Sequence, residues 1–332
     1  LSLLLFIIVL FSYIHVQHQY KTSNELEIYE YDYTSTEDLY GVCKWKQPVL
    51  FSLELSPLVP DTLPKMNIRS VQDYLGDDDK VKHSYLPYHS AMRLIDTDTN
   101  GVYYSDQNRK QIYDSKSWSK WFNENEVLLR PSLNIMSQYD LIYGARKSHT
   151  ITKYHKETSR FLYLPPGHES LRIRMCPYSF KHIVRPKTDY VTYEMYSTTD
   201  LYELNEDNQI LEFALHGGSI LSIPPYWFYS IEFMGKNSVV CEFTYSTLPN
   251  VVANAKDLAI YFTQQQNIID MRKAKSDHVK TPTEKPKESE QTVEDKKDVL
   301  PTNDTNDTNE SPTPNKEVVE EMIEELKPKE NI

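Results

Sequence analysis

The stretch at residues 218–233 constrains the fold more than any other part of this 332-residue chain. It reads GSILSIPPYWFYSIEF, so an apolar segment runs into two consecutive prolines, Pro224 and Pro225, and a second alternating segment follows two aromatic residues later. Proline has no N–H to donate to a strand ladder and fixes its own φ, so the two prolines must end the first segment. The pattern predicts two strands joined by a rigid aromatic turn.

The composition changes sharply along the chain. Residues 24–273 have ordinary globular character, whereas residues 274–332 contain no Phe, Trp, Tyr or Gly and carry 9 lysines against 16 acidic residues. A segment with so little to bury cannot offset the entropy of ordering, so we expect a disordered acidic tail over 274–332. Within it, residues 316–327 carry an apolar stripe among glutamates. This stripe predicts a short helix that either frays or folds on a protein partner.

The charges and the cysteines argue against two classes of protein. The chain has a net charge of −12 without a cluster of positive charge, so we expect no nucleic-acid partner. The three cysteines, Cys43, Cys176 and Cys241, are far apart and lack metal-type spacing, which argues against a disulfide framework. Cys241 lies in an apolar run and is expected in the core.

The N-terminal residues 1–14 are almost wholly apolar. This run is shorter than the roughly 20 residues that span a bilayer, and it has the length of a signal-peptide core, but no small-residue cleavage motif follows it. We therefore expect an uncleaved signal anchor over residues 1–16 and a single-pass membrane protein, in preference to a buried segment of the domain. Three glycosylation-type sequons in the tail, at residues 303–311, favour a lumenal or external orientation without deciding it.

Between anchor and tail the sequence predicts one domain over residues 24–273. Trp118, Trp121 and Phe122 recur at helical spacing within 114–125 and predict a helix that packs into the core. Residues 249–273 predict a C-terminal helix that packs across the domain or mediates homodimer contacts. Strands are expected at 26–31, 46–53, 128–144 (as a pair), 171–175 and 238–246, and strands with turns at 81–113.

The stretch at 218–233 resembles the G-D-x-[LIV]-[FY]-[IV]-P-x-x-W-[WY]-H signature of JmjC and cupin-like dioxygenases. The segment Lys46-Gln47-Pro48-Val49 is similar to the strand that opens their domain, and Tyr139-Asp140-Leu141 with Gly144 is similar to the element before their first metal motif. The similarity covers about residues 24–270 and extends to the cupin-like proteins of large DNA viruses. It implies a mainly β fold with flanking helices (α+β), namely a double-stranded β-helix (jelly-roll/cupin) barrel with its core at about 128–246.

In that family an H-x-D/E pair and a distal His after the P-x-x-W turn bind iron and leave positions for 2-oxoglutarate and oxygen. This chain has Tyr229 at the distal position. Aligned from Thr150, the first His and the acid are replaced by Lys153 and His155. Only a shifted register restores the pair, as His155-x-Glu157.

A second alignment, taken back from Phe161, places Tyr154 and Lys156 at the two ligand positions. No catalytic residue and no metal ligand is therefore expected, and no cofactor. The resemblance implies instead a pocket at the barrel mouth that could bind a carboxylate or a sugar-like ligand. Its candidate residues are Lys153, His155, Glu157, Trp227 and Tyr229.

The sequence thus predicts a membrane-anchored cupin/JmjC-like domain that acts as a binding or scaffold module. The alternative is an Fe(II)/2-oxoglutarate-dependent protein hydroxylase that uses His155, Glu157 and an unidentified third ligand. A third hypothesis is a protein that binds sugars or polysaccharides, which a barrel permits but does not require.

Overall fold

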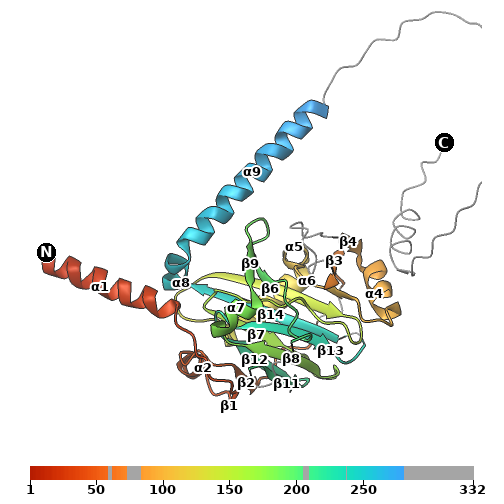
Figure 1. Cartoon of the computed structure of the whole chain (residues 1–332), viewed down its shortest axis with the longest axis horizontal. Helices are drawn as coiled ribbons and strands as arrows, with labels where there is room; N and C mark the ends of the chain where they lie inside the picture. Colours follow the sequence, from red (N-terminus) through yellow and green to blue (C-terminus); the bar gives the residue numbers. More distant parts are fainter. Residues whose placement is uncertain (59–61, 73–83, 205–208, 237, 280–332) are drawn as a thin grey trace, which may run out of the picture. The chain divides into compact units, whose positions relative to one another are not determined.

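The computed structural model describes residues 1–58, 62–72, 84–204, 209–236 and 238–279, with side chains up to residue 268. The expected helix at 316–327 and the three sequons lie outside the described residues. Residues 1–279 form one compact unit of mixed α+β structure with a large multi-stranded sheet and an N-terminal apolar helix (Figure 1).

Nine of the described strands form one sheet. Their order is β1 (Tyr29–Tyr31), β2 (Val49–Ser52), β12 (Ser219–Ile223), β7 (Ser159–Tyr163), β14 (Ser238–Thr247), β6 (Asn134–Gly144), β5 (Tyr103–Ser105), β3 (Lys65–Ser70) and β4 (Ser84–Pro87). All neighbours pair antiparallel except β1 and β2, which are parallel.

A smaller sheet has the order β11 (Leu211–Leu215), β8 (Leu171–Cys176) and β13 (Phe228–Phe233). The extended segment 149–155 runs along the free edge of β13, with bridges from His149 to Glu232 and from Lys153 to Tyr229. A hairpin of β9 (Pro186–Asp189) and β10 (Glu194–Ser197) lies beyond it and bridges Lys153 through Tyr196.

The described residues also form helices. They are α1 (Ser2–Gln19), α2 (Thr36–Cys43), α4 (Tyr88–Thr97), α5 (Arg109–Asp114), α6 (Lys116–Asn125), α7 (Lys181–Val184), α8 (Leu248–Ala253) and α9 (Ala255–Val279), with single 3₁₀ turns at η1 (Glu126–Leu128) and η2 (Tyr178–Phe180).

The strands and the turn expected at 218–233 are present as β12 and β13. Because β12 belongs to the large sheet and β13 to the small one, the Pro-Pro turn carries the chain from one sheet to the other. Tyr226 in this turn has a φ of 70°, a left-handed conformation that a non-glycine residue adopts rarely. The turn is therefore a sharp, tightly specified corner.

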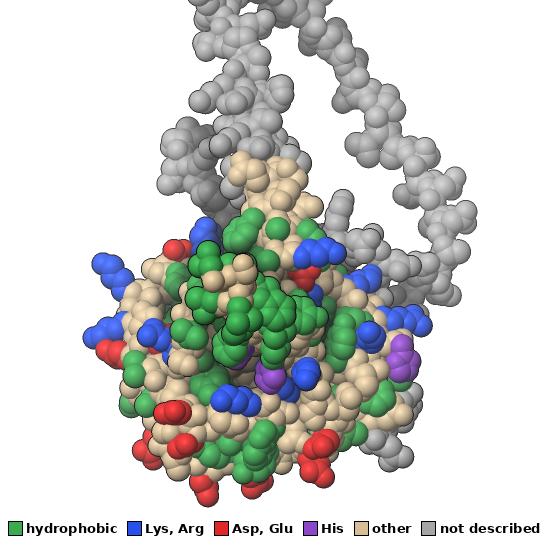
Figure 2. Space-filling view, turned by 90° about the vertical axis from the view of Figure 1, so that its left-hand side faces the viewer, with side chains coloured by type: hydrophobic (Ala, Val, Ile, Leu, Met, Phe, Trp, Pro, Cys, Tyr) green, Lys and Arg blue, Asp and Glu red, His purple; other side chains and the backbone are tan. Residues whose placement is uncertain are grey.

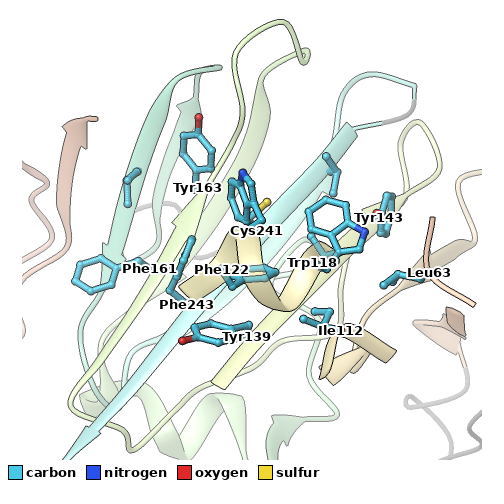
Figure 3. Packing of buried hydrophobic residues seen from close by; sticks show 14 of the residues in the cluster. Leu63, Ile112, Trp118, Phe122, Tyr139, Tyr143, Phe161, Tyr163, Cys241 and Phe243 are labelled. Atoms are coloured by element: carbon cyan, nitrogen blue, oxygen red, sulfur yellow. The ribbon is translucent and has the colours of Figure 1, made fainter. Parts of the chain in front are cut away.

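The central strands of the large sheet bury both faces. Along β14, Val239, Cys241 and Phe243 belong to the apolar cluster beneath α6, whereas Val240 belongs to the cluster between the two sheets. This alternation follows from the period of two residues in a strand. Figure 3 shows Phe122 of α6 packed against Phe243 and Tyr139, with Trp118 of the same helix beside it, which confirms the expected core helix at 114–125.

Several expected boundaries differ from the structure. The helix expected at 249–273 is divided at Asn254 into α8 and α9, and α9 continues to Val279, beyond the expected end of the domain at 273. The expected strand pair at 128–144 is one strand that starts at Asn134, preceded by the 3₁₀ turn η1. The expected strands at 81–113 include two helices, α4 and α5.

Candidate functional site

Three ionisable side chains of the large sheet face the small sheet. They are Asp140 of β6, Arg160 of β7 and Glu242 of β14. Each lies two residues along its strand from an apolar residue of the cluster between the sheets, and therefore on the same face of the strand. Glu242 lies directly opposite Asp140 in the strand register. All three are buried, so this end of the interior is a polar region within an otherwise apolar core.

Lys153 and Tyr229 contribute from the opposite side. The backbone N–H of Lys153 donates to the carbonyl of Tyr229 at 2.9 Å, and the N–H of Tyr229 donates back at 2.8 Å. Two residues paired in this way present their side chains on the same face. In the alignment that starts at Thr150, Lys153 stands at the position of the first histidine and Tyr229 at the position of the distal histidine. These two positions are therefore directly beside each other in the structure.

The Lys153 side chain is held by two carboxylates. Its Nζ pairs with Asp106 and lies 3.4 Å from Oε1 of Glu194. Arg69 completes the group, since its Nη1 donates to Asp106 at 2.9 Å and its Nη2 donates to Glu194 at 2.7 Å. Burial opposes the charge on Lys153, but the two carboxylates outweigh it and raise the pKa of the lysine well above its usual value.

Tyr229 is held by a second group of charges. The Arg160 guanidinium donates to the Tyr229 hydroxyl at 2.8 Å and to Glu157 at 3.4 Å, and it lies 3.7 Å from Glu242. Burial raises the pKa of Tyr229 to about 12, so the phenol stays protonated at neutral pH. A neutral phenol held by a guanidinium is a poor replacement for a metal-binding imidazole.

His155 is fully buried between the two sheets. Its Nε2 lies 2.9 Å from the carbonyl oxygen of Ile223, and its Nδ1 lies 3.5 Å from the Glu157 carboxylate. Burial lowers the pKa of His155, which favours the neutral imidazole. Although burial opposes its ionisation, Arg160 and His155 hold the pKa of Glu157 well below its usual value.

Asp140 is a buried carboxyl group whose pKa is raised. Its carboxylate accepts the backbone N–H groups of Gln107 and Asn108, both at 2.7 Å. Burial, reinforced by the nearby charges of Glu242 and Asp106, raises its pKa to about 7. This carboxyl group therefore titrates near neutral pH.

The structure brings four of the five expected site residues together. Lys153, His155, Glu157 and Tyr229 lie within this buried network, whereas the Trp227 indole N–H donates to the carbonyl of Ser23 at 3.1 Å. Trp227 thus ties the N-terminal segment to the domain. Sequence reasoning missed five charged residues: Arg69, Asp106, Arg160, Glu194 and Glu242.

A small hollow lies above the network, and room for about one water molecule remains in it. It is lined by Gln107, Arg109, Lys153, Tyr154, Glu157, Arg160, Tyr193, Glu194 and Met195. Of the cations that line the hollow, Lys153 and Arg160 are paired with carboxylates, whereas Arg109 donates to the side-chain oxygen of Gln138 at 2.6 Å. Among the residues that the structure describes, no three His, Cys, Asp or Glu side chains gather in a way that could hold a metal ion.

Comparison with known proteins does not assign this chain to a family. A scan of protein-family models finds no match, and neither does a search of curated proteins.

Proposed function

We propose that the chain is a membrane-anchored cupin/JmjC-like domain that lacks an intact iron triad and acts as a binding or scaffold module. The strand order supports the double-stranded β-helix that this proposal needs. From β6 to β14 the chain passes back and forth between the large sheet and the small one. In the large sheet these strands have the order β12-β7-β14-β6. In the small sheet the order is β11-β8-β13, and segment 149–155 lies next to β13. Two facing four-membered layers of this kind are typical of jelly-roll architectures.

The observation that carries the proposal is the state of Lys153 and Tyr229. These residues stand where the resemblance places two iron-binding imidazoles, and each is committed to an internal partner. Lys153 pairs with Asp106 and Glu194, and Tyr229 accepts from Arg160. A buried ammonium group at that position repels a divalent cation and fills the space that it would need.

The rival hydroxylase would use His155 and Glu157. Nε2 of His155 already faces the carbonyl oxygen of Ile223, Nδ1 has no hydrogen-bond partner among the described residues, and the Glu157 carboxylate faces Arg160 at 3.4 Å. A metal bound by Nδ1 and Glu157 would have to draw Glu157 away from Arg160 in a buried region, so the geometry favours the binding or scaffold module. The small size of the hollow favours partner contacts on the outer surface over a ligand inside.

The anchor rests on α1. This helix of 18 residues has a mean hydropathy of 1.5 and no buried residue. At a rise of 1.5 Å per residue it is about 27 Å long, close to the roughly 30 Å thickness of a bilayer core. A signal sequence has similar properties, so the anchor is part of the proposal.

Two measurements on the full chain test the proposal. Expressed in cells, the chain should stay with the membrane pellet after alkaline carbonate extraction, because a spanning helix resists that treatment. Supplied with ferrous iron, oxygen, ascorbate and 2-oxoglutarate, the purified chain should form no succinate above the background of the denatured protein. Succinate formation that His155→Ala abolishes would establish the hydroxylase instead.

A further inference from the structure

We propose that the face of the domain around the base of α1 lies on an anionic lipid surface, with Trp45 and Tyr29 at headgroup depth and Lys21 and Lys44 toward the lipid phosphates. This inference rests on the proposed membrane anchor and adds to it a second contact, made by the folded domain itself.

The connection between α1 and the domain is short. The helix ends at Gln19, and the hydroxyl of the next residue, Tyr20, donates to the carbonyl of Ala253 in α8. Three residues later the Ser23 N–H donates to the carbonyl of Lys46 at 3.3 Å. Four residues of chain reach at most about 14 Å when fully extended. A bilayer that holds α1 therefore also meets the surface of the domain around its base.

An exposed pair of aromatic residues lies close to that base. The rings of Tyr29 and Trp45 meet edge to face, with centroids 5.0 Å apart, and the two residues are 37% and 55% exposed. The other three tryptophans of the chain, Trp118, Trp121 and Trp227, are all buried. Tyrosine and tryptophan are the residues enriched where a protein meets the headgroup layer, because each has an apolar body and a polar tip.

Apolar side chains of α8 extend this surface. Leu248 and Val252 are 51% and 54% exposed and lie one helical turn apart, so they share a face of α8. The same helix contacts α1. Leu248 and Val252 thus place exposed apolar groups on a helix that lies against the anchor.

Basic side chains lie near the end of α1. Lys21 and Lys44 are exposed, and together with Lys46 they lie close enough to His18, at the end of α1, to interact with it electrostatically. Figure 2 shows Lys and Arg side chains around the apolar helix α1, which points toward the viewer, with most acidic side chains toward the rim. Glu25 is an acidic neighbour, and it accepts from the Gln47 side chain. Basic residues next to a membrane helix favour anionic lipids, which is the reason for choosing a lipid surface over a second protein chain.

The test uses Trp45 as a built-in probe. The full chain is reconstituted in vesicles of phosphatidylcholine alone or with about a third phosphatidylserine, and its fluorescence is quenched with brominated lipids or with aqueous iodide. We expect brominated lipids to quench an emission component that Trp45→Phe removes. We also expect the double variant Lys21→Glu/Lys44→Glu to lose that quenching in anionic vesicles. The matched control, Lys116→Glu/Lys120→Glu on α6, should keep it.

The outcomes separate this inference from the anchor. If the chain resists carbonate extraction but Trp45 is quenched by iodide and not by brominated lipids, the anchor stands and the lipid-facing surface is wrong. Protection of Trp45 from both quenchers would mean that a protein surface covers it, which also overturns the inference. If carbonate extracts the chain, the anchor fails and the inference fails with it.

Discussion

Lys153 and Tyr229 exchange both backbone hydrogen bonds across adjacent extended segments, yet their side chains belong to two different charge networks. Lys153 joins Asp106, Glu194 and Arg69, while Tyr229 joins Arg160 with Glu157 and Glu242. Ion pairs of these two networks thus fill the interior around Lys153 and Tyr229.

Removing the Lys153 ammonium should destabilise the fold. Lys153→Met leaves Asp106 and Glu194 with Arg69 as their remaining cation, and breaking a buried pair in this way costs about 3–5 kcal/mol. Urea unfolding of the full chain measures the change. The control is Lys120→Ala, whose exposed pair with Glu124 should contribute under about 1 kcal/mol. Equal stability of the two variants would contradict the closed network.

Loss of the Tyr229 hydroxyl should have a smaller effect. Tyr229→Phe removes an acceptor from a buried guanidinium, and a hydrogen bond to a charged group contributes about 1.5–3 kcal/mol. Tyr113→Phe is the matched control, because its hydroxyl donates to a carbonyl at an exposed site. If both variants unfold at the same urea concentration as the wild type, the hydroxyl does not hold Arg160.

Asp140 should make stability depend on pH in a direction unusual for a carboxylate. Its pKa in the folded state is about 7, above the unfolded value of 3.8, so the folded chain binds the proton more tightly. The free energy of unfolding of the wild type, relative to Asp140→Asn, should therefore be highest at acid pH. It should fall as pH rises from about 4 to 7 and then level off. Urea unfolding across that pH range measures the difference, and a difference that rises with pH would show that Asp140 is ionised in the folded chain.

Close approach of the two sheets should make Gly144 intolerant of a side chain. A Cβ at this position would meet the ring of Phe233 in β13, so Gly144→Ala should cost about 1–3 kcal/mol through overpacking. Gly41 in α2 is the control, because a Cβ there meets nothing within 4 Å and alanine should stabilise the helix by about 0.5–1 kcal/mol. Thermal unfolding of both variants should give shifts of opposite sign.

The spacing of apolar residues in the sequence predicted the strands and helices in which buried residues recur at the regular interval of a strand or a helix. The strand–turn–strand at 218–233, the strand at Leu171–Cys176 and the core helix α6 are all present, because alternating or helical spacing of apolar residues is set by the backbone itself. Helix α4 was missed although Ala91, Leu94 and Ile95 follow helical spacing. The short polar segments around it favoured strands and turns.

The charge network could be predicted only in part. Glu242 and Arg160 carried a signal, since each is a charged residue within an apolar strand whose neighbours alternate into the core. Arg69, Asp106 and Glu194 carried none. They come from β3, the end of β5 and β10, and only the tertiary fold brings them to Lys153.

Anaerobic titration of the full chain with ferrous iron and 2-oxoglutarate tests the central claim most directly. We expect no stoichiometric iron and no metal-to-ligand absorption band, because Lys153 and Tyr229 stand where the proposed resemblance places two ligands and their partners hold them there. Near-stoichiometric iron with a band that depends on 2-oxoglutarate and is lost in His155→Ala would contradict it, and would identify His155 and Glu157 as part of a working metal centre.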